Sequence, residues 1–484
     1  MSISTTIRSI QNIMRKDAGV DGDAQRIGQL GWMLFLKIFD DQEQELELTK
    51  DDYKSPIPKS SRWRNWAADP EGITGETLLE FVNNDLFRKL KNLATTSSGQ
   101  NPRGFVVQSV FQDAFNYMKN GTLMRQVINK LNEIDFNRIS DRHLFNDIYE
   151  KILKDLQSAG NAGEFYTPRA VTQFMVDMVD PKLGEKALDP ACGTGGFITC
   201  AIEHVRKNYV KNPEDRETLQ KSFFGIEKKQ LPHLLCTTNM LLHDIEVPSQ
   251  IRHDNALSRP LKDYGPADRV DVIITNPPFG GMEEDGIEMN FPASFRTRET
   301  ADLFLLLLMR LLKDGGRAGI VLPDGTLFGE GVKTRIKEKL LNECNLHTVV
   351  RLPNGVFNPY TGIKTNLLFF TKGKQTKNIW YYEHPYPPGI KSYSKTKPML
   401  IEEFEPEKKW WNKRKENEFA WKVTVDEIKG SNYNLDIKNP NSVEQGNANP
   451  EKLLKEYKKL LAEMGATRES LKKELMDSLG KTST

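Results

Sequence analysis

The sequence is poor in cysteine and histidine, and this scarcity excludes several kinds of site. Its 484 residues include 4 cysteines and 7 histidines. No C-x-x-C pair occurs among the cysteines, which are Cys192, Cys200, Cys236 and Cys344, and the histidines form no cluster with metal-ligand spacing. A disulfide-stapled scaffold and a zinc knuckle are therefore not indicated. So few cysteines fit a reducing compartment, and the cytoplasm is the expected location.

Long apolar runs and an excess of one charge are also missing. The longest apolar run extends from Leu303 to Met309, far short of the ~20 residues that cross a membrane. The N-terminus has no basic start or apolar core of a signal peptide, so we expect no membrane association. Lys and Arg number 68 and Asp and Glu 66, giving a net charge of +2. This excludes a molecule coated uniformly with positive charge for nucleic acid.

Length and periodicity predict several parts. At roughly 150 residues per domain, the chain has room for about three domains. Apolar residues recur at helical spacing through the first third, without short β-rich runs, which predicts an all-α domain at 1–155. A second domain is predicted at 156–438. A polar linker at 439–449 and a leucine-striped helical tail at 450–484 complete the chain.

The second domain is predicted to have an α/β fold. Short apolar runs alternate there with helical segments, which favours a mainly parallel, doubly wound sheet with helices on both faces. Ligands of such sheets bind beyond the carboxyl ends of the strands, so residues at those ends are candidates for a site. Strands are predicted at 186–188, 223–226, 270–274, 317–322, 348–352 and 366–371.

Three features with ligand-binding chemistry follow predicted strands. Residues 189–197 read DPACGTGGF, and their glycines let the backbone approach a ligand at the start of a helix. Asp189 opens this loop and either orients it or attracts a cationic group. Glu227 ends the next strand, where a carboxylate can accept hydrogen bonds from two ribose hydroxyls. Asp254 can accept one from the exocyclic amine of adenine. The alternatives are a structural glycine turn and solvated strand-end acids.

The most specific feature is the turn Asn276-Pro277-Pro278-Phe279, which follows the strand predicted at 270–274. The two prolines fix the backbone and remove two N–H donors, which leaves carbonyls as acceptors. The amide oxygen of Asn276 and the carbonyl of Pro277 can both accept from one –NH₂ group. Its lone pair is then directed at an electrophile, so the chemistry is positioning rather than strong base catalysis. Phe279 offers a flat face for a planar ring. The alternative is an Asn-Pro turn closing a buried strand.

Together with EFYTPR at 164–169 and NYNLD at 432–436, these motifs resemble the amino-methylating, S-adenosylmethionine-dependent DNA methyltransferases. More closely, nearly the whole chain resembles the modification subunit of type I restriction–modification systems. The resemblance implies a Rossmann-like methyltransferase core whose mainly parallel sheet ends in a C-terminal antiparallel hairpin. An all-α domain precedes the core and a helical tail follows it. The implied activity is site-specific methylation of adenine N6 in DNA, on a base flipped out of the duplex.

The resemblance also assigns roles to residues. Glu227 is implied to hold the ribose of the cofactor, Asp254 its adenine, and residues 164–169 its methionine end. Phe357 is predicted to stack on the second side of the target base. No metal is implied. The target base is assigned to Asn276, Pro277, Pro278 and Phe279. The cofactor is assigned to Glu164, Phe165, Tyr166, Thr167, Pro168, Arg169, Asp189, Thr194, Gly195, Gly196, Glu227 and Asp254.

The implied partners follow from what the chain has no room for. Residues 280–372 complete the sheet, and the tail is too short for a domain that reads base edges. Target choice is therefore expected from a separate specificity subunit. The resemblance also implies double-stranded DNA, a second copy of the modification subunit, and a restriction subunit in the full complex. The tail at 450–484 is predicted to dock on the specificity subunit; the alternative is that it folds back on its own chain.

Some alternatives stay open. Residues 372–397 hold six lysines against one acid, Glu383, with interleaved aromatics. This pattern suits a track for the DNA backbone, or else a solvated hairpin with ordinary strand aromatics. Amino-methylation of cytosine N4, RNA or protein glutamine is the first rival function. The second is a non-catalytic scaffold of a defence complex, against which the intact Asn276–Phe279 turn and glycine loop argue.

Overall fold

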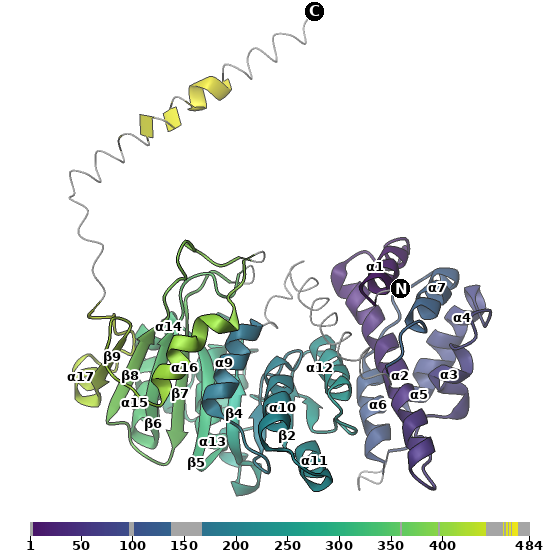
Figure 1. The fold of residues 1–484 in the computed structure, drawn as a ribbon, viewed down its shortest axis with the longest axis horizontal. Helices are drawn as coiled ribbons and strands as arrows, with labels where there is room; N and C mark the ends of the chain where they lie inside the picture. Colours follow the sequence, from purple (N-terminus) through teal and green to yellow (C-terminus); the bar gives the residue numbers. More distant parts are fainter. Residues whose placement is uncertain are drawn as a thin grey trace, which may run out of the picture.

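A helical region and an α/β region lie side by side in the computed structural model (Figure 1). Residues 3–95, 101–136, 167–358, 361–394 and 397–441 are described, together with several positions between 458 and 472. The predicted boundary at 155/156 lies outside the described residues. So do most of the linker at 439–449 and most of the tail at 450–484, whose described positions are helical.

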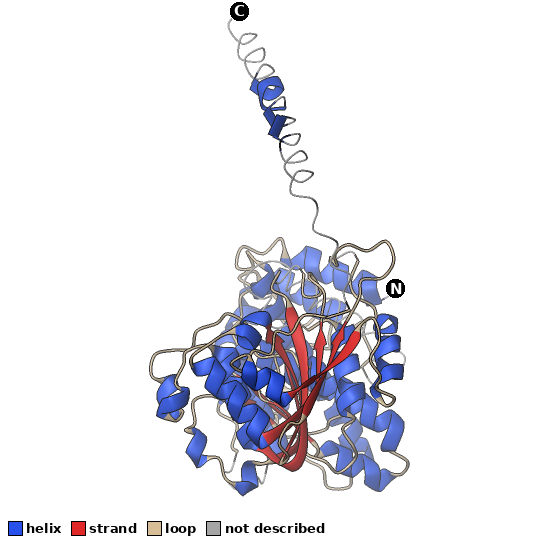
Figure 2. Cartoon of the chain, turned by 90° about the vertical axis from the view of Figure 1, so that its left-hand side faces the viewer, coloured by secondary structure: helices blue, strands red, loops and turns tan. Residues whose placement is uncertain are grey.

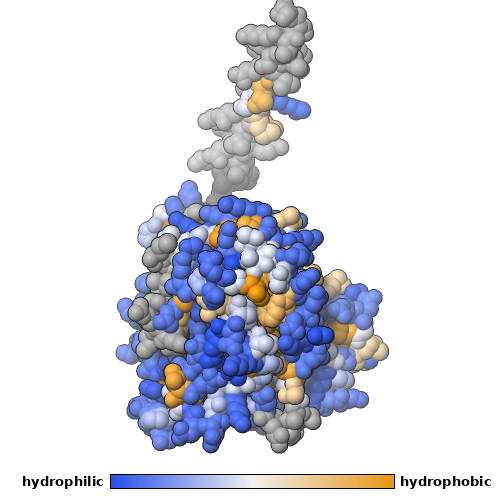
Figure 3. All heavy atoms as spheres, turned by 90° about the vertical axis from the view of Figure 1, so that its right-hand side faces the viewer, coloured by the Kyte–Doolittle hydropathy of each residue, from blue (hydrophilic) through white to orange (hydrophobic). Residues whose placement is uncertain are grey.

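The first region is built around a long helix, α2 (Asp23–Thr49). Trp32, Phe87 and Phe111 meet edge to face in its core, with ring centroids 5.0 to 6.4 Å apart. Its outer face, turned away from the sheet, is mainly hydrophilic with smaller apolar areas (Figure 3). The other α-helices here are α1 (Ile3–Met14), α3 (Trp63–Trp66), α4 (Gly75–Glu80), α5 (Phe87–Lys91), α6 (Pro102–Gln112) and α7 (Gly121–Leu131).

A nine-stranded sheet of order β3-β2-β1-β4-β5-β7-β6-β8-β9 forms the second region. Strand β7 runs antiparallel to β5 and β6, β9 runs antiparallel to β8, and the remaining pairs are parallel. The mainly parallel sheet with a C-terminal antiparallel hairpin is therefore confirmed. The strands are β1 (Ala187–Asp189), β2 (Phe223–Glu227), β3 (Ile251–His253), β4 (Val270–Thr275), β5 (Leu312–Pro323), β6 (Cys344–Arg351), β7 (Thr365–Lys372), β8 (Asn378–Glu383) and β9 (Ala420–Thr424).

Helices cover both faces of this sheet (Figure 2). One apolar core lies between the sheet and α13 with α15, and a second lies under α9, α10 and α16. The strands carry apolar side chains on both faces of the sheet, and each face is buried by one of these cores. The architecture is therefore doubly wound. The α-helices are α9 (Arg169–Val179), α10 (Gly196–Tyr209), α11 (Pro213–Gln220), α12 (Gln230–Leu242), α13 (Thr300–Leu311), α14 (Asp324–Phe328), α15 (Val332–Glu343), α16 (Glu405–Trp411) and α17 (Val425–Gly430).

The two regions meet through α12. Leu234, Leu235, Leu241 and Leu242 of this helix belong to the same apolar core as α2. An ion pair between Arg103 and Glu43, 2.7 Å from Nε to Oε1, is buried nearby. The helical region is thus attached to the helix that follows β2, close to the sheet edge where the candidate residues lie.

The stretch at 372–397 contains β8, which was not predicted as a strand. Tyr381, Tyr382 and Tyr393 are buried there, and Tyr381 stacks on Trp421 of β9 at 5.3 Å between ring centroids. Tyr381 and Tyr382 are thus strand aromatics of β8 and Tyr393 lies in the loop beyond it, and burial leaves none of the three rings available to nucleic acid. The strand aromatics of that alternative are confirmed for Tyr381 and Tyr382, but the stretch is not a hairpin, because β6 lies between β7 and β8.

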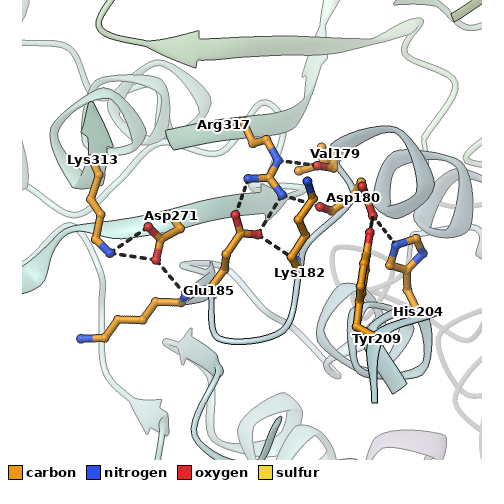
Figure 4. A network of polar contacts seen from close by, with 10 residues as sticks. Val179, Asp180, Lys182, Glu185, His204, Tyr209, Asp271, Lys313 and Arg317 are labelled. Carbon is orange, nitrogen blue, oxygen red and sulfur yellow. Dashed lines mark hydrogen bonds and ion pairs between the residues drawn. The ribbon is translucent and has the colours of Figure 1, made fainter. Parts of the chain in front are cut away.

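Paired charges close the amino ends of β1, β4 and β5 (Figure 4). The guanidinium of Arg317 donates to both carboxylate oxygens of Glu185 at 2.8 Å and to the carbonyl of Val179 at 2.6 Å. Lys313 Nζ lies 2.8 Å from both oxygens of Asp271. This edge is held by satisfied hydrogen bonds. Within the described residues, no helix is long and apolar enough to cross a membrane.

Candidate active site

The predicted site residues converge on the carboxyl edge of the sheet. Strands β1, β2 and β4 are parallel neighbours, so their ends lie on one side. The glycine loop follows β1, Glu227 ends β2, and Asn276 comes directly after β4. Positions far apart in the sequence are thereby brought to a single edge.

The backbone of the glycine loop is fixed by its neighbours. Gly195 has φ of +86°, and a Cβ there would lie 2.7 Å from the sulfur of Cys236 on α12. Glycine is therefore required by both conformation and space. The amide of Gly193 donates to Glu227 Oε2 at 2.9 Å, and Asn239 Nδ2 donates to the carbonyl of Thr194 at 3.2 Å. The loop presents a preset backbone surface at the start of α10.

Two carboxylates lie at the ends of β2 and β3. Glu227 is 7% exposed, and its Oε1 accepts from the amide of Lys229 at 2.7 Å. Burial raises the pKa of Glu227 above its ordinary value, and backbone donors offset this only in part. Each oxygen keeps a further lone pair for a ligand. The amide of Asp254 donates to the carbonyl of Glu227 at 2.9 Å, and its side chain is exposed.

Asp189 contacts the protein rather than open space. Its Oδ1 accepts from Thr275 Oγ1 at 2.6 Å and from the amide of Ala191 at 3.1 Å. Burial raises the pKa of Asp189 to about 7, although both hydrogen bonds favour the charged form. Of the two readings of Asp189, the geometry favours the one in which it orients the loop. Thr275 was missed by the sequence reading, although its place directly before Asn276 was a usable signal.

The amide of Asn276 is held in one orientation. Its Nδ2 donates to Thr167 Oγ1 at 3.0 Å. Its Oδ1 is buried and has no hydrogen-bond partner in the part of the chain that the structure describes. A buried acceptor left unpaired is costly, so such a group is typical of a site that receives a donor from a ligand.

Phe279 is half-buried beside this amide. It meets Phe357 edge to face, with ring centroids 6.0 Å apart and planes at 78°. Phe357 is only 3% exposed. The expectation that Phe357 faces a base from the second side is therefore wrong for this structure, since the ring is buried and supports Phe279 instead. An aromatic in a loop cannot be assigned to a ligand or to the core from sequence alone.

The first part of the EFYTPR motif, Glu164, Phe165 and Tyr166, lies outside the described residues. Thr167 is adjacent to Asn276 as described, and Pro168 precedes the first residue of α9. Arg169 Nη2 donates to Glu203 of α10 at 2.8 Å. The guanidinium thus links α9 to α10, a contact that the sequence did not indicate.

The donor set suits a nucleoside cofactor and an amino-group substrate. Fixed glycine amides, two adjacent carboxylates and the unpaired Asn276 oxygen lie along one edge, as S-adenosylmethionine and an exocyclic amine require. No group of three His, Cys, Asp or Glu side chains that could hold a metal occurs among the described residues.

Comparison with known proteins decides the family. A family model described as N-6 DNA Methylase matches residues 140–448, and one described as HsdM N-terminal domain matches residues 3–131. The chain belongs to the N-6 DNA methylase family. It is thus an enzyme of the adenine-N6 DNA methyltransferase type, whose cofactor is S-adenosylmethionine. The resemblance read from the motifs is confirmed.

Relatives of this methylase cover nearly all of its length. It is 67% identical to the type I restriction enzyme EcoEI methylase subunit of Escherichia coli, over 98% of this chain and 97% of that protein. A crystal structure of a modification subunit of a putative type I restriction enzyme from Vibrio vulnificus YJ016 shares 47% identity at a TM-score of 0.83. That match covers 91% of this chain and 97% of the other. A structure from a study of complex assembly in a type I system shares 36% identity at a TM-score of 0.81 and covers 98% of both chains.

Proposed function

We propose that this methylase is the modification subunit of a type I restriction–modification complex and that Asn276 positions the N6 amine of a flipped adenine for methylation. One observation carries the proposal. Asn276 Oδ1 is buried without a hydrogen-bond partner among the described residues, while Thr167 fixes the other end of the amide. An oriented, unsatisfied acceptor is suited to a ligand –NH₂ group.

The turn residues divide the work on the target base. Asn276 Oδ1 and the Pro277 carbonyl accept one N–H bond each, which directs the nitrogen lone pair away from the turn. Phe279 stacks on the flat face of the ring, and Phe357 keeps Phe279 in place through their edge-to-face contact. The prolines lock the backbone, so the acceptors need not be reorganised when the base arrives.

The loops on the other side of Asn276 hold the cofactor. S-adenosylmethionine, when bound, supplies an electrophilic methyl group. The backbone of Thr194, Gly195 and Gly196 surrounds it, Glu227 accepts from the ribose hydroxyls, and Asp254 accepts from the adenine amine. Asp189 keeps the glycine loop in register with β4 through Thr275. Residues 164–169 close the methionine end.

Target choice is expected to come from the other subunits of the complex. Its relatives include a methylase subunit and a modification subunit of type I restriction enzymes, which supports a role within an assembly. We expect a specificity subunit to select the sequence, with a second modification subunit, a restriction subunit and double-stranded DNA completing the cytoplasmic complex. We propose that the chain divides into an all-α domain at 1–155, a catalytic domain at 156–438, a linker at 439–449 and a docking tail at 450–484.

The methylated nucleoside tests this proposal directly. The chain is purified with its specificity subunit, incubated with unmethylated DNA and methyl-labelled S-adenosylmethionine, and the DNA is digested to nucleosides for mass spectrometry. Label in N6-methyladenine is expected. Label in N4-methylcytosine, or transfer only to RNA or protein, would replace adenine as the substrate. Absence of transfer by a folded, cofactor-binding complex would favour the scaffold alternative.

Docking by the tail needs its own experiment. Removing residues 450–484 is expected to prevent co-purification with the specificity subunit, because an amphipathic helix stabilises such contacts through its apolar face. The mass of the complex, measured by light scattering, reports assembly without depending on activity. Unchanged assembly would show that the tail is not the docking element.

A further inference from the structure

Two residues that follow the cofactor acids converge on one carboxylate. Lys228 comes directly after Glu227, and Asn255 directly after Asp254. Lys228 Nζ lies 3.1 Å from Glu283 Oε2, and Asn255 Nδ2 lies 3.4 Å from the same oxygen. The ends of β2 and β3 therefore both reach Glu283, seven residues beyond Asn276.

Glu283 belongs to a loop whose two arms are tied together. Its amide donates to the carbonyl of Arg298 at 2.9 Å, and Arg298 Nη2 donates back to the Glu283 carbonyl at 3.0 Å. One step further out, the amide and hydroxyl of Thr300 donate to the carbonyl of Gly281 at 3.1 and 2.9 Å. Residues 280–300 thus form a closed loop that starts at the target-base turn.

The environment of Glu283 differs from that of its neighbour. The Glu283 side chain is 10% exposed, whereas that of Glu284 is 74% exposed, although both pair with Lys228. Burial alone would lower the pKa of Lys228, but hydrogen bonds to Glu284 and Glu283 raise it above its ordinary value. A buried carboxylate is kept only where its partners are well placed. The pair of Lys228 with Glu283 therefore fixes the position of the loop, while the pair of Lys228 with Glu284 is a surface contact.

We propose that Glu283 is a positioning residue that transmits occupancy of the cofactor site to the target-base loop at 280–300. The proposal rests on the roles given above to Glu227, Asp254 and Asn276. A ligand on Glu227 and Asp254 immobilises the next residues, Lys228 and Asn255, and these hold Glu283 and its loop against the site. By linkage, a loop held in this position strengthens cofactor binding by the same factor.

Amide hydrogen exchange in the full chain measures this link. S-adenosylhomocysteine is the probe, and its dissociation constant is measured by calorimetry for each protein. In the unmodified chain, the probe is expected to slow exchange in peptides covering 280–300. In Glu283→Ala, this slowing should fall by about fivefold or more, the lower range of coupling between sites. By the same linkage, the dissociation constant should rise by a matching factor and no more.

Two further variants keep the outcome clear. Glu284→Ala is the matched control, because it removes the exposed partner of the same lysine, and it should behave as the unmodified chain. Glu283→Gln retains an acceptor for Asn255 but loses the charge facing Lys228, so it should recover part of the slowing. It also gives a measurement if Glu283→Ala does not fold.

Three results would overturn the link: no slowing at 280–300 in the unmodified chain, full slowing in both Glu283 variants, or equal loss in Glu284→Ala. A chain that does not bind S-adenosylhomocysteine would overturn the proposed function itself, and the link with it.

Discussion

Charged groups are paired differently at the amino ends of the strands (the amino edge of the sheet) and at their carboxyl ends (the carboxyl edge). At the amino edge, burial alone would raise the pKa of Asp271, but hydrogen bonds from Lys313 and the amide of Lys186 lower it below its ordinary value. At the carboxyl edge, burial raises the pKa of Asp189 and of Glu227, and the hydrogen bonds to both, with the charges of Lys229 and His253 near Glu227, only partly offset it. The amino edge therefore stabilises the ionised form of its carboxylate, whereas the carboxyl edge disfavours the ionised form of its two carboxylates.

This difference separates structural from functional polar groups. Arg317 makes a bidentate contact with Glu185 and caps α9 at the amino edge. Asn276 leaves its oxygen unpaired at the carboxyl edge. Buried polar groups are paired at the amino edge but not fully paired at the carboxyl edge, which indicates that the carboxyl edge binds a ligand. The predictions below test whether activity and stability can be separated along this line.

The largest effect is expected for Asn276→Ala. Methyl transfer should fall by about 100- to 1000-fold, as when an oriented polar group is removed from a transition state. Affinity for S-adenosylhomocysteine should stay close to that of the unmodified complex and the thermal midpoint should fall only slightly, because the variant loses the hydrogen bond from Nδ2 to Thr167 while Oδ1 has no partner within the described protein to lose. Single-turnover methylation and calorimetry on the same preparation are the measurements. Substantial turnover would contradict the role of Asn276.

At the amino edge, Arg317→Met is expected to reduce stability and to leave activity unchanged. It removes the bidentate contact with Glu185 and the bond to the Val179 carbonyl while keeping most of the apolar volume. The free energy of unfolding should fall by about 2 kcal/mol, since the side chains are a quarter exposed and solvent weakens the pair. Urea unfolding measures this loss. The methylation rate per folded molecule should not change, and a large drop there would erase the contrast between edges.

A smaller effect is expected for Asp189→Asn, as a change in pH dependence. The folded pKa of about 7 lies above the unfolded value of 3.8, so the native state binds the proton more tightly. Stability is therefore lost as pH rises from about 4 to about 7. Asparagine keeps an acceptor for Thr275 and cannot ionise, so the variant should show a flatter curve of unfolding free energy against pH. Parallel curves for the two proteins would contradict the assignment.

The smallest effect is expected for His204→Gln. Burial lowers the pKa of His204, but the hydrogen bonds that it donates to Asp177 and Asp180 more than compensate and raise it above 6.5. Its contribution to stability is complete below that value and is lost as pH rises through the folded pKa. The variant should be less stable by under about 1 kcal/mol at pH 6 and equal to the unmodified chain at high pH. A deficit that grows with pH would reverse the sign and contradict the pairing.

Local constraints made much of this protein readable from sequence. Glycines at 193–196 and prolines at 277–278 restrict the backbone by themselves, so the loop and turn could be placed at strand ends without a structure. The six predicted strands are rich in apolar residues and were found. Strand β3 has three residues, of which Arg252 and His253 are polar and exposed, so it carries no apolar run. Strands β8 and β9 lie among lysines, which hid their buried faces.

Contacts across the fold could not be predicted. Thr275 meets Asp189 across 86 positions, and Asn276 meets Thr167 across 109. The sequence of neither motif indicates which residue it will contact, because both contacts form only when β1, α9 and β4 are assembled. For the same reason, Glu283 was not distinguished from Glu284, although one is buried and the other is exposed.

The position of the target base tests the central claim most directly. A structure of the modification–specificity complex with S-adenosylhomocysteine and a duplex carrying its methylation site would locate the base. We predict an adenine outside the duplex, with N6 about 2.7–3.2 Å from Asn276 Oδ1, the range of a hydrogen bond. A different base in the turn, or an adenine whose N6 lies beyond hydrogen-bond distance of that oxygen, would contradict the account.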